Sequence, residues 1–213
     1  GGTNTRVVLG DEGGNILARL SEKTETGKGA EDISGQIIRM IRSIHIEGFR
    51  LKDAEGIGIG STGPLDLKRG CLTKPTNIPF DFVPLVEPLE RDLGLPTHLL
   101  NDCSAAVMGE KFFGAGRNLQ NLAYITLSTG IGGGVYVDGH LLIGKDGNAA
   151  EIGHFTIDLE GRLRCGCGRR GHWEAYCSAS NIPNYVRLLL EGMDAKMVEK
   201  SLLMKLAEGS RQN

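Results

Sequence analysis

The sequence lacks three features that would assign it to a membrane, a secretory pathway or a nucleic acid. No apolar run among its 213 residues approaches the roughly 20 residues that a bilayer-spanning helix requires. No basic segment followed by an apolar one begins the chain, so no signal peptide is visible. The formal net charge of −2 gives no clustered positive surface of the kind that binds phosphate backbones. We therefore expect neither a membrane nor a nucleic acid as a partner.

The sequence has five cysteines, and its glycine content is high. The five cysteines are an odd number, and two of them form a Cys165-Gly166-Cys167 pair that is too close for an ordinary disulfide framework. Both observations favour a reducing cytoplasm. The 32 glycines are about twice the usual share and are clustered rather than spread. Clustered glycines indicate binding loops rather than disorder.

Strand patterns alternate with helix patterns along the chain, which predicts the α/β class. A hairpin is expected over residues 5–20, with a turn at Asp11-Glu12-Gly13-Gly14 between its strands. An apolar stripe predicts a helix over residues 33–46. Residues 74–84 contain three prolines and predict an irregular surface loop. We expect two lobes, residues 1–100 and residues 101–213, although no shift in composition marks the boundary.

Two thiols and two imidazoles follow one another at a spacing typical of a metal site. The four residues are His154, Cys165, Cys167 and His172. Zinc prefers these ligands, and a site closed by four protein ligands is usually structural. The alternative is a pair of reduced, buried cysteines without a metal. Glu151 and Glu174 flank the motif, and a purely structural zinc would not need them.

Two glycine-rich segments could present backbone N–H groups to phosphate oxygens. Residues 128–134 read Ser-Thr-Gly-Ile-Gly-Gly-Gly after an expected strand, and residues 1–4 read Gly-Gly-Thr-Asn before another. Backbone amides without bulky side chains form anion-binding concavities, to which the hydroxyls of Ser128 and Thr129 would add donors. The alternative for residues 128–134 is a tight turn between paired strands.

Asn101 and Asp102 stand where an expected strand meets an expected helix. Sheets of the α/β class commonly present reactive groups at this position. An aspartate there can accept the proton of a sugar hydroxyl that attacks phosphorus. The alternative is a helix N-cap, for which Asn and Asp are favoured residues, and this alternative is the stronger one when the pair is considered alone.

Taken together, these motifs resemble the ROK family of sugar kinases, repressors and related open reading frames. The resemblance rests on Gly1-Gly2-Thr3-Asn4, on Asn101-Asp102 with Gly109-Glu110, on Ser128 to Gly134, and on Glu151 to Gly171 with its Cys-x-Cys pair. It implies an actin/hexokinase-like fold, in which two ribonuclease-H-like lobes close over a cleft, with the second lobe incomplete in this chain. It also implies a structural Zn²⁺, Mg²⁺ bound with ATP, and a homodimer or homotetramer.

The resemblance further implies an ATP-dependent hexose kinase similar to glucokinases, with Asp102 as general base for phosphorylation of the sugar 6-hydroxyl. The sugar contacts it implies are Gly63, Asn77, Asn101, Asp102, Glu151, His154 and Glu174. The phosphate and ATP contacts it implies are Gly1, Gly2, Thr3, Asn4, Ser128, Thr129, Gly130, Gly132 and Gly133. Two alternative functions are a sugar-responsive repressor and a kinase for an N-acetylated amino sugar.

Three departures from the family pattern stand out. His172 occupies the position of a third cysteine, which changes the ligand set to Cys₂His₂. The aspartate that usually lies two residues before Gly1 is absent, and the chain ends before the segment expected to hold adenine. We therefore expect a fragment that is inactive in isolation.

Overall fold

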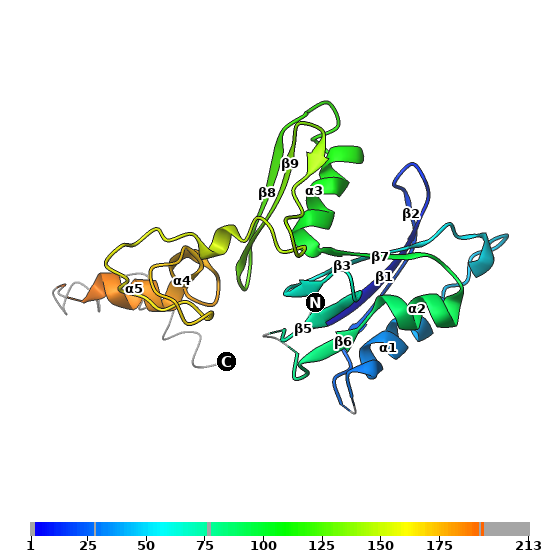
Figure 1. Cartoon of the computed structure of the whole chain (residues 1–213), viewed down its shortest axis with the longest axis horizontal. Helices are drawn as coiled ribbons and strands as arrows, with labels where there is room; N and C mark the ends of the chain where they lie inside the picture. The colour runs from blue at the N-terminus through cyan, green and yellow to red at the C-terminus, as the bar shows by residue number, and fades with distance from the viewer. Residues whose placement is uncertain (1–2, 28, 76–77, 192, 194–213) are drawn as a thin grey trace. The chain divides into compact units, whose positions relative to one another are not determined.

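The structure, a computed structural model, describes residues 3–27, 29–75, 78–191 and 193 (Figure 1). The predictions for Gly1, Gly2 and Asn77, and for a helical pattern beyond residue 193, lie outside these ranges. The chain divides into two interleaved compact units. Unit 1 comprises residues 1–125 and 133–150, and unit 2 comprises residues 126–132 and 151–213. The expected division into lobes at residue 100 stays a prediction.

Unit 1 begins with the expected hairpin, β1 (Asn4–Gly10) paired antiparallel with β2 (Ile16–Lys23). Its turn is closed by the Gly14 N–H, which donates to the Asp11 carbonyl at 3.0 Å. Helix α1 (Glu31–Arg42) ends earlier than the apolar pattern predicts. The buried Gln36 of α1 donates to the Lys23 carbonyl at 2.8 Å and accepts the Glu25 N–H at 3.0 Å. This amide fixes α1 to the end of β2.

A parallel pair of strands, β3 (Ile57–Ser61) and β7 (Thr97–Asn101), lies in the same unit with Ser61 opposite Asn101. The short 3₁₀ helix η1 (Leu51–Asp53) precedes β3. Helix α2 (Val86–Leu93) precedes β7 and ends at Gly94, whose φ of 68° is the left-handed conformation that glycine tolerates best. Helix α3 (Asp102–Phe112) follows β7 without a loop. The strand-to-helix junction at Asn101 and Asp102 is therefore as the sequence predicts.

The chain between β3 and α2 forms a small three-stranded antiparallel sheet, which was not predicted from the sequence. Its strands are β4 (Leu65–Asp66), β5 (Cys71–Thr73) and β6 (Phe82–Pro84), in that order. The expectation of an irregular loop over residues 74–84 is wrong at its end, because Phe82 pairs with Thr73. Strands of two or three residues are too short to leave an alternating pattern.

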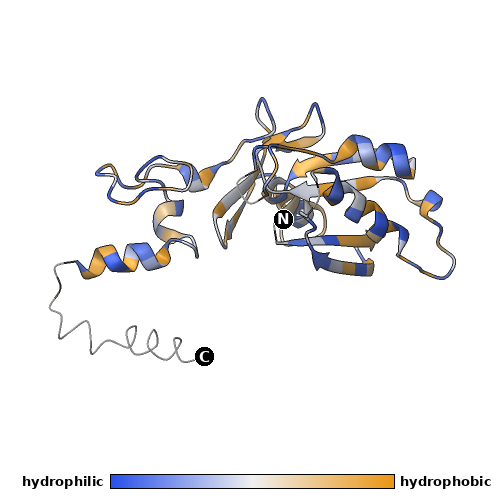
Figure 2. Ribbon diagram, turned by 90° about the horizontal axis from the view of Figure 1, so that it is seen from below, coloured by the Kyte–Doolittle hydropathy of each residue, from blue (hydrophilic) through white to orange (hydrophobic). Residues whose placement is uncertain are grey.

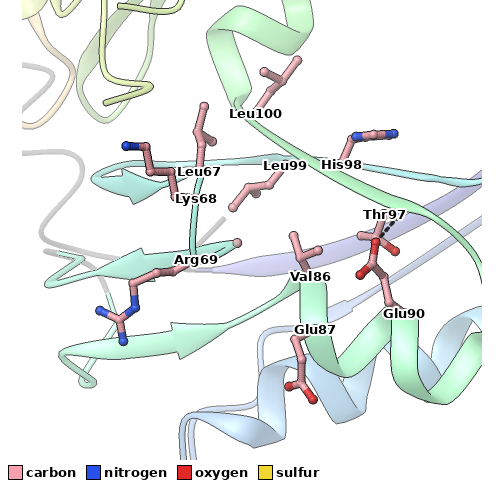
Figure 3. Close-up of a pocket in the computed structure, with 11 residues that line it drawn as sticks. Leu67, Lys68, Arg69, Val86, Glu87, Glu90, Thr97, His98, Leu99 and Leu100 are labelled. Carbon is pink, nitrogen blue, oxygen red and sulfur yellow. Dashed lines mark hydrogen bonds between the residues drawn. The ribbon is translucent and has the colours of Figure 1, made fainter. Parts of the chain in front are cut away.

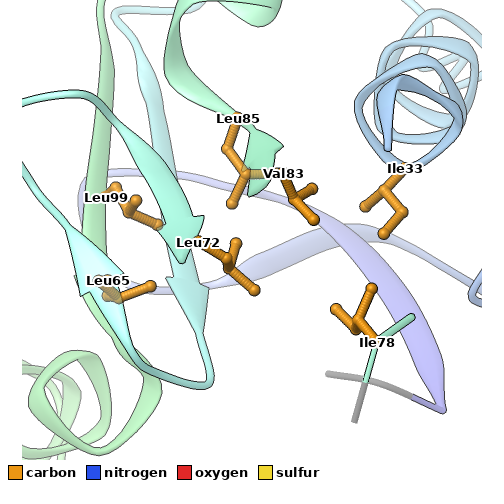
Figure 4. Packing of buried hydrophobic residues seen from close by; sticks show 7 residues of the cluster. All are labelled: Ile33, Leu65, Leu72, Ile78, Val83, Leu85 and Leu99. Carbon is orange, nitrogen blue, oxygen red and sulfur yellow. The ribbon is translucent and has the colours of Figure 1, made fainter. Parts of the chain in front are cut away.

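The core of unit 1 lies between this small sheet, β7 and α1 (Figure 4). Its buried members are Ile33, Leu65, Leu72, Ile78, Val83, Leu85 and Leu99. Figure 4 shows Ile33 on α1, Ile78 on the segment between β5 and β6, and the others on or next to strands. Val83 and Leu72 are at most 2% exposed, so the small sheet is a structural part of the core.

Strands β8 (Leu122–Leu127), β9 (Ile131–Val137) and β10 (His140–Leu141) form a further sheet in the order β10-β9-β8. The chain leaves unit 1 within β8 and returns to it within β9. Gly134 of β9 lies so close to the Cys103 carbonyl of α3 that any side chain at residue 134 would clash. A glycine is therefore required where β9 approaches α3.

The described residues of unit 2 contain little regular structure. It contains the 3₁₀ helix η2 (Ile152–His154), α4 (Glu174–Cys177) and α5 (Ile182–Leu190). Cys165, Ala175 and Tyr176 form its buried core, against which Tyr185 and Leu188 of α5 pack. Figure 2 shows that polar and apolar residues both occur along α5. Among the residues that the structure describes, no helix has the length and apolar character of a membrane span.

Candidate functional site

The four expected metal ligands come together in unit 2. The ligand atoms of His154, Cys165, Cys167 and His172 all lie within 4.8 Å of one another. Cys165 Sγ lies 3.7 Å from His154 Nδ1, and Cys167 Sγ lies 3.3 Å from His172 Nδ1. Ligands at zinc bond lengths in a tetrahedron are about 3.3–3.8 Å apart, and these two pairs have that spacing.

Backbone hydrogen bonds hold the loop that carries these ligands. The Gly171 carbonyl accepts the N–H groups of Ile157 and Asp158 at 2.8 and 3.1 Å, and the Gly171 N–H donates to the Leu163 carbonyl at 3.0 Å. Gly171 has a φ of 77° and lies against the Asp158 carbonyl, so a side chain there would clash. The Trp173 N–H donates to the Phe155 carbonyl at 2.9 Å. Together these bonds align the segment after His154 with the segment around His172.

Burial shifts the pKa of two of the candidate ligands. It raises the pKa of the Cys165 thiol to about 11. It also lowers the pKa of His172, with His154 and Arg169 contributing in the same direction. The neutral imidazole is the form that binds a metal, whereas the thiol must lose its proton. Metal binding at neutral pH is therefore expected to release a proton from Cys165.

A hydrogen-bonded pair of side chains, Asp158 and Tyr176, also stabilises this loop. The Tyr176 O–H donates to Asp158 Oδ2, and the Leu163 N–H donates to the Tyr176 oxygen at 3.0 Å. Asp158 Oδ2 also accepts the Arg162 N–H at 3.0 Å. The pKa of Asp158 lies well below its usual value, chiefly because of the Tyr176 hydrogen bond. The sequence offered no pattern that predicts this pair.

Glu174, an expected sugar contact, is half-buried and accepts a hydrogen bond from the glycine-rich segment. Its Oε2 accepts the Ile131 N–H at 2.9 Å, and its Oε1 lies 3.7 Å from Cys165 Sγ. One carboxylate therefore joins the metal cluster to the loop. Glu151, the other flanking acid, is exposed, and its Oε2 lies 3.9 Å from His154 Nε2.

The loop between β8 and β9 forms a tight turn that is hydrogen-bonded to the segment after α4. The Ser128 N–H donates to the Gly130 carbonyl at 2.9 Å, which is the alternative that the sequence left open. The Ser128 and Thr129 carbonyls accept hydrogen bonds from Ala179 N–H at 2.8 Å and Ser180 Oγ at 2.7 Å. The turn is therefore attached to the segment after α4. A role in phosphate binding stays a prediction for Ser128, Thr129, Gly130, Gly132 and Gly133.

Asn101 caps α3, which is the alternative interpretation of the pair. Its Oδ1 accepts the N–H groups of Cys103 and Ser104 at 2.9 and 3.4 Å. The neighbouring Asp102 is exposed, and its Oδ1 accepts the Cys103 N–H at 2.8 Å. Capping and a catalytic role are compatible, because the cap fixes the start of α3 and thereby the Asp102 carboxylate.

Gly63 lies near the side chains of both Asn101 and Asn148. An added side-chain carbon at Gly63 would lie 3.4 Å from Asn148 Oδ1 and 3.9 Å from Asn101 Nδ2. Asn148 accepts the Leu65 N–H and donates to the Leu65 carbonyl, both at 3.1 Å. It also donates to the Asp146 carbonyl at 3.0 Å. The sequence analysis missed Asn148, because only the fold brings residue 148 to residue 65.

The remaining predicted residues of unit 1 are Thr3 and Asn4. Asn4 begins β1 opposite Lys23, and the Thr3 carbonyl accepts the Thr24 N–H at 3.1 Å. A cavity of about 560 Å³ elsewhere in unit 1 lies between α2, β7 and residues 67–70 (Figure 3). None of the predicted site residues lines it.

Comparisons with known proteins find similar sugar kinases. A glucokinase from Pyrobaculum calidifontis is 39% identical over 212 residues, covering 100% of this chain and 66% of the relative. An N-acetylmannosamine kinase from Salmonella newport is 33% identical over 213 residues, covering 100% of this chain and 69% of the relative. The crystal structure of a ROK family glucokinase from Streptomyces griseus in complex with glucose and AMPPNP superimposes with a TM-score of 0.72 at 36% identity, covering 91% of this chain and 60% of the neighbour.

The chain thus spans less than two thirds of the length of the glucokinases that it matches. The structural match confirms the expected α/β, actin/hexokinase-like fold. The ROK family model matches residues 1–210, almost the whole chain. This chain belongs to the ROK family.

Proposed function

We propose that the protein is an ATP-dependent hexose kinase of the glucokinase type, with Asp102 as its general base. The observation that carries the proposal is the exposed Asp102 carboxylate at the end of β7, beside the Asn101–Gly63 junction. The 39% identity to a glucokinase supports glucose as the sugar.

In the proposed reaction, Asp102 orients the sugar 6-hydroxyl and accepts its proton as the hydroxyl oxygen bonds to the γ-phosphorus of ATP. The bond between that phosphorus and the β,γ-bridging oxygen breaks, and ADP leaves with the electron pair. Asp102 Oδ1 is held by the Cys103 N–H, so we assign the proton to Oδ2. Mg²⁺ bound with ATP would supply charge neutralisation at the phosphates.

We propose that the sugar hydroxyls are bound by Gly63, Asn77, Asn101, Glu151, His154 and Glu174. Carboxylates and amides read hydroxyls at fixed angles by hydrogen bonds. We propose that ATP phosphates are bound by residues 1–4 and by Ser128, Thr129, Gly130, Gly132 and Gly133. Because the N–H groups of Ser128 and Ile131 already donate within the protein, the hydroxyls and the other amides of the turn carry this role.

We further propose that His154, Cys165, Cys167 and His172 bind a structural Zn²⁺. Four protein ligands leave no open position on a tetrahedral ion, so this zinc would not activate water. The location in the cytoplasm and the homodimer or homotetramer implied by the family stay predictions.

The test is a coupled assay of ADP formation over a panel of hexoses, with the protein extended to the full length of its relatives. Replacing Asp102 with Ala should lower kcat at least about a hundredfold, a typical loss for a general base, while sugar binding measured by calorimetry persists. The matched control is Glu55→Ala, at an exposed carboxylate before β3. Retained turnover in the Asp102→Ala protein would contradict the assignment.

A second candidate is a kinase for an N-acetylated amino sugar, favoured by the 33% identity to an N-acetylmannosamine kinase. The same panel separates the two candidates. A kcat/KM for N-acetylmannosamine above that for glucose would replace the first proposal with the second. Absence of turnover with every sugar, together with retained sugar binding, would favour a repressor.

A further inference from the structure

The metal cluster and the glycine-rich turn share one residue, Ile131. Its N–H donates to Glu174 Oε2 at 2.9 Å, and Glu174 stands two residues after the metal ligand His172. Its carbonyl lies against Gly153, the residue before the metal ligand His154, so closely that a side chain at Gly153 would clash. The N–H and the carbonyl of Ile131 thus each contact a residue that lies close in sequence to a different candidate metal ligand.

Burial makes the contact with Glu174 strong. Ile131 is 5% exposed, and Gly153 is buried. A hydrogen bond to a carboxylate in a partly buried position contributes more than a neutral one, and an unpaired N–H there is costly. The Ile131 N–H therefore depends on the position of the Glu174 carboxylate.

Chain connectivity transmits the metal geometry to that carboxylate. Glu174 is the first residue of α4, and the Ala175 N–H donates to the His172 carbonyl at 2.9 Å. Fixing His172 on an ion therefore fixes the first turn of α4. Gly130 lies against the same carboxylate oxygen, and an added side-chain carbon there would be 2.6 Å from Oε2. Little room is left for Glu174 to move without moving the turn.

We propose that metal binding orders the glycine-rich turn through Glu174. The cluster would then determine the conformation of this turn as well as that of its own segment. Glu174 is then a positioning residue for the turn. The identity of the ligand at the turn rests on the proposed function, whereas the coupling itself does not.

The test measures hydrogen exchange at the Ile131 amide by NMR on the ¹⁵N-labelled chain. One equivalent of zinc added to the metal-free protein should slow exchange at Ile131 about tenfold or more. In Glu174→Ala, zinc should still bind, as counted by metal analysis, but the slowing at Ile131 should be lost. Glu174→Gln should retain most of it, because the amide Oε1 still accepts the N–H.

Two further variants complete the experiment. Gly130→Ala, whose added carbon would displace Glu174 Oε2, should lose the slowing as Glu174→Ala does, and it replaces that variant if the latter does not fold. Glu160→Ala, at a carboxylate that is 79% exposed, is the matched control and should behave as the parent. Unchanged Ile131 exchange on zinc binding, or equal slowing with and without the Glu174 carboxylate, would overturn the proposal.

The effect of Glu174 on nucleotide affinity is measured separately, in the full-length protein. The affinity for a non-hydrolysable ATP analogue, measured without sugar, should fall at least about fivefold in Glu174→Ala and remain close to the parent value in Glu174→Gln. A role limited to sugar contact would leave nucleotide affinity unchanged in both variants and would overturn the link to the phosphate loop. If the parent protein binds no nucleotide, the proposed function fails, while the exchange experiment still decides the coupling.

Discussion

Asn148 offers a quantitative test of how the loop around Gly63 is held. Its side chain makes two hydrogen bonds to Leu65, at 3.1 Å each, across 83 residues of sequence. Leu65 is 3% exposed, so water does not replace these partners readily. Substitution of Asn148 with Ala removes both bonds and leaves a buried donor and acceptor to find new ones.

The expected loss follows from these contacts. Two neutral hydrogen bonds contribute about 0.5–1.5 kcal/mol each, and an unsatisfied buried group costs about 1–3 kcal/mol, so we expect a loss of about 2–3 kcal/mol in the free energy of unfolding. For a chain of this length, each kcal/mol lowers the Tm by about 2–4 °C, which gives a shift of roughly 4–12 °C.

The assay is urea unfolding followed by circular dichroism, with calorimetry for the Tm. The matched control is Asn118→Ala, at an exposed asparagine, which should change the free energy of unfolding by less than about 0.5 kcal/mol. The reasoning is refuted if Asn148→Ala is no less stable than this control. In the full-length protein the same variant should raise the KM for the hexose more than it lowers kcat, because it loosens the loop that carries Gly63.

Three more predictions concern the metal, the Asp158–Tyr176 hydrogen bond and the core of unit 1. Metal analysis should find about one zinc per chain, with a large loss in His172→Ala; unchanged zinc content would place the fourth ligand elsewhere. Tyr176→Phe should lower the Tm at pH 7. The depressed pKa of Asp158 means that its contribution is present above the unfolded-state pKa near 4 and disappears as the pH falls, so the difference from the parent should shrink below pH 4; a constant difference would contradict the pair. Leu72→Ala should lower the free energy of unfolding by about 2–5 kcal/mol, whereas Leu159→Ala, at a 94% exposed side chain, should have little effect; equal effects would contradict the assigned core.

The metal cluster was predictable from the sequence because its chemistry restricts the choice of residues. Few side chains bind zinc, and three of the four candidate ligands lie close together in sequence, from Cys165 to His172. Backbone hydrogen bonds of Gly171 and Trp173 align the segment after His154 with them. The junction at Asn101 was predictable for a similar reason, since strand and helix patterns meet there and both of its interpretations follow from local preferences.

The partners of Glu174 and Asn148 could not be predicted in the same way. Each contacts a backbone group far away in sequence, at Ile131 and Leu65, and a backbone N–H leaves no trace in the residue type that carries it. The small sheet β4-β5-β6 was missed because its strands are shorter than one period of any reliable pattern. Only the path of the chain determines such contacts.

The hydrogen bond between Ile131 and Glu174 has a consequence for synthesis on the ribosome. Its two partners are 43 residues apart, so at 5–20 residues per second the turn is made roughly 2–9 s before the carboxylate that holds it. During that interval Gly153 and the metal ligands are also still to be added. Until residue 174 is added, the nascent turn has its own hydrogen bond from the Ser128 N–H to the Gly130 carbonyl but lacks the carboxylate that accepts the Ile131 N–H.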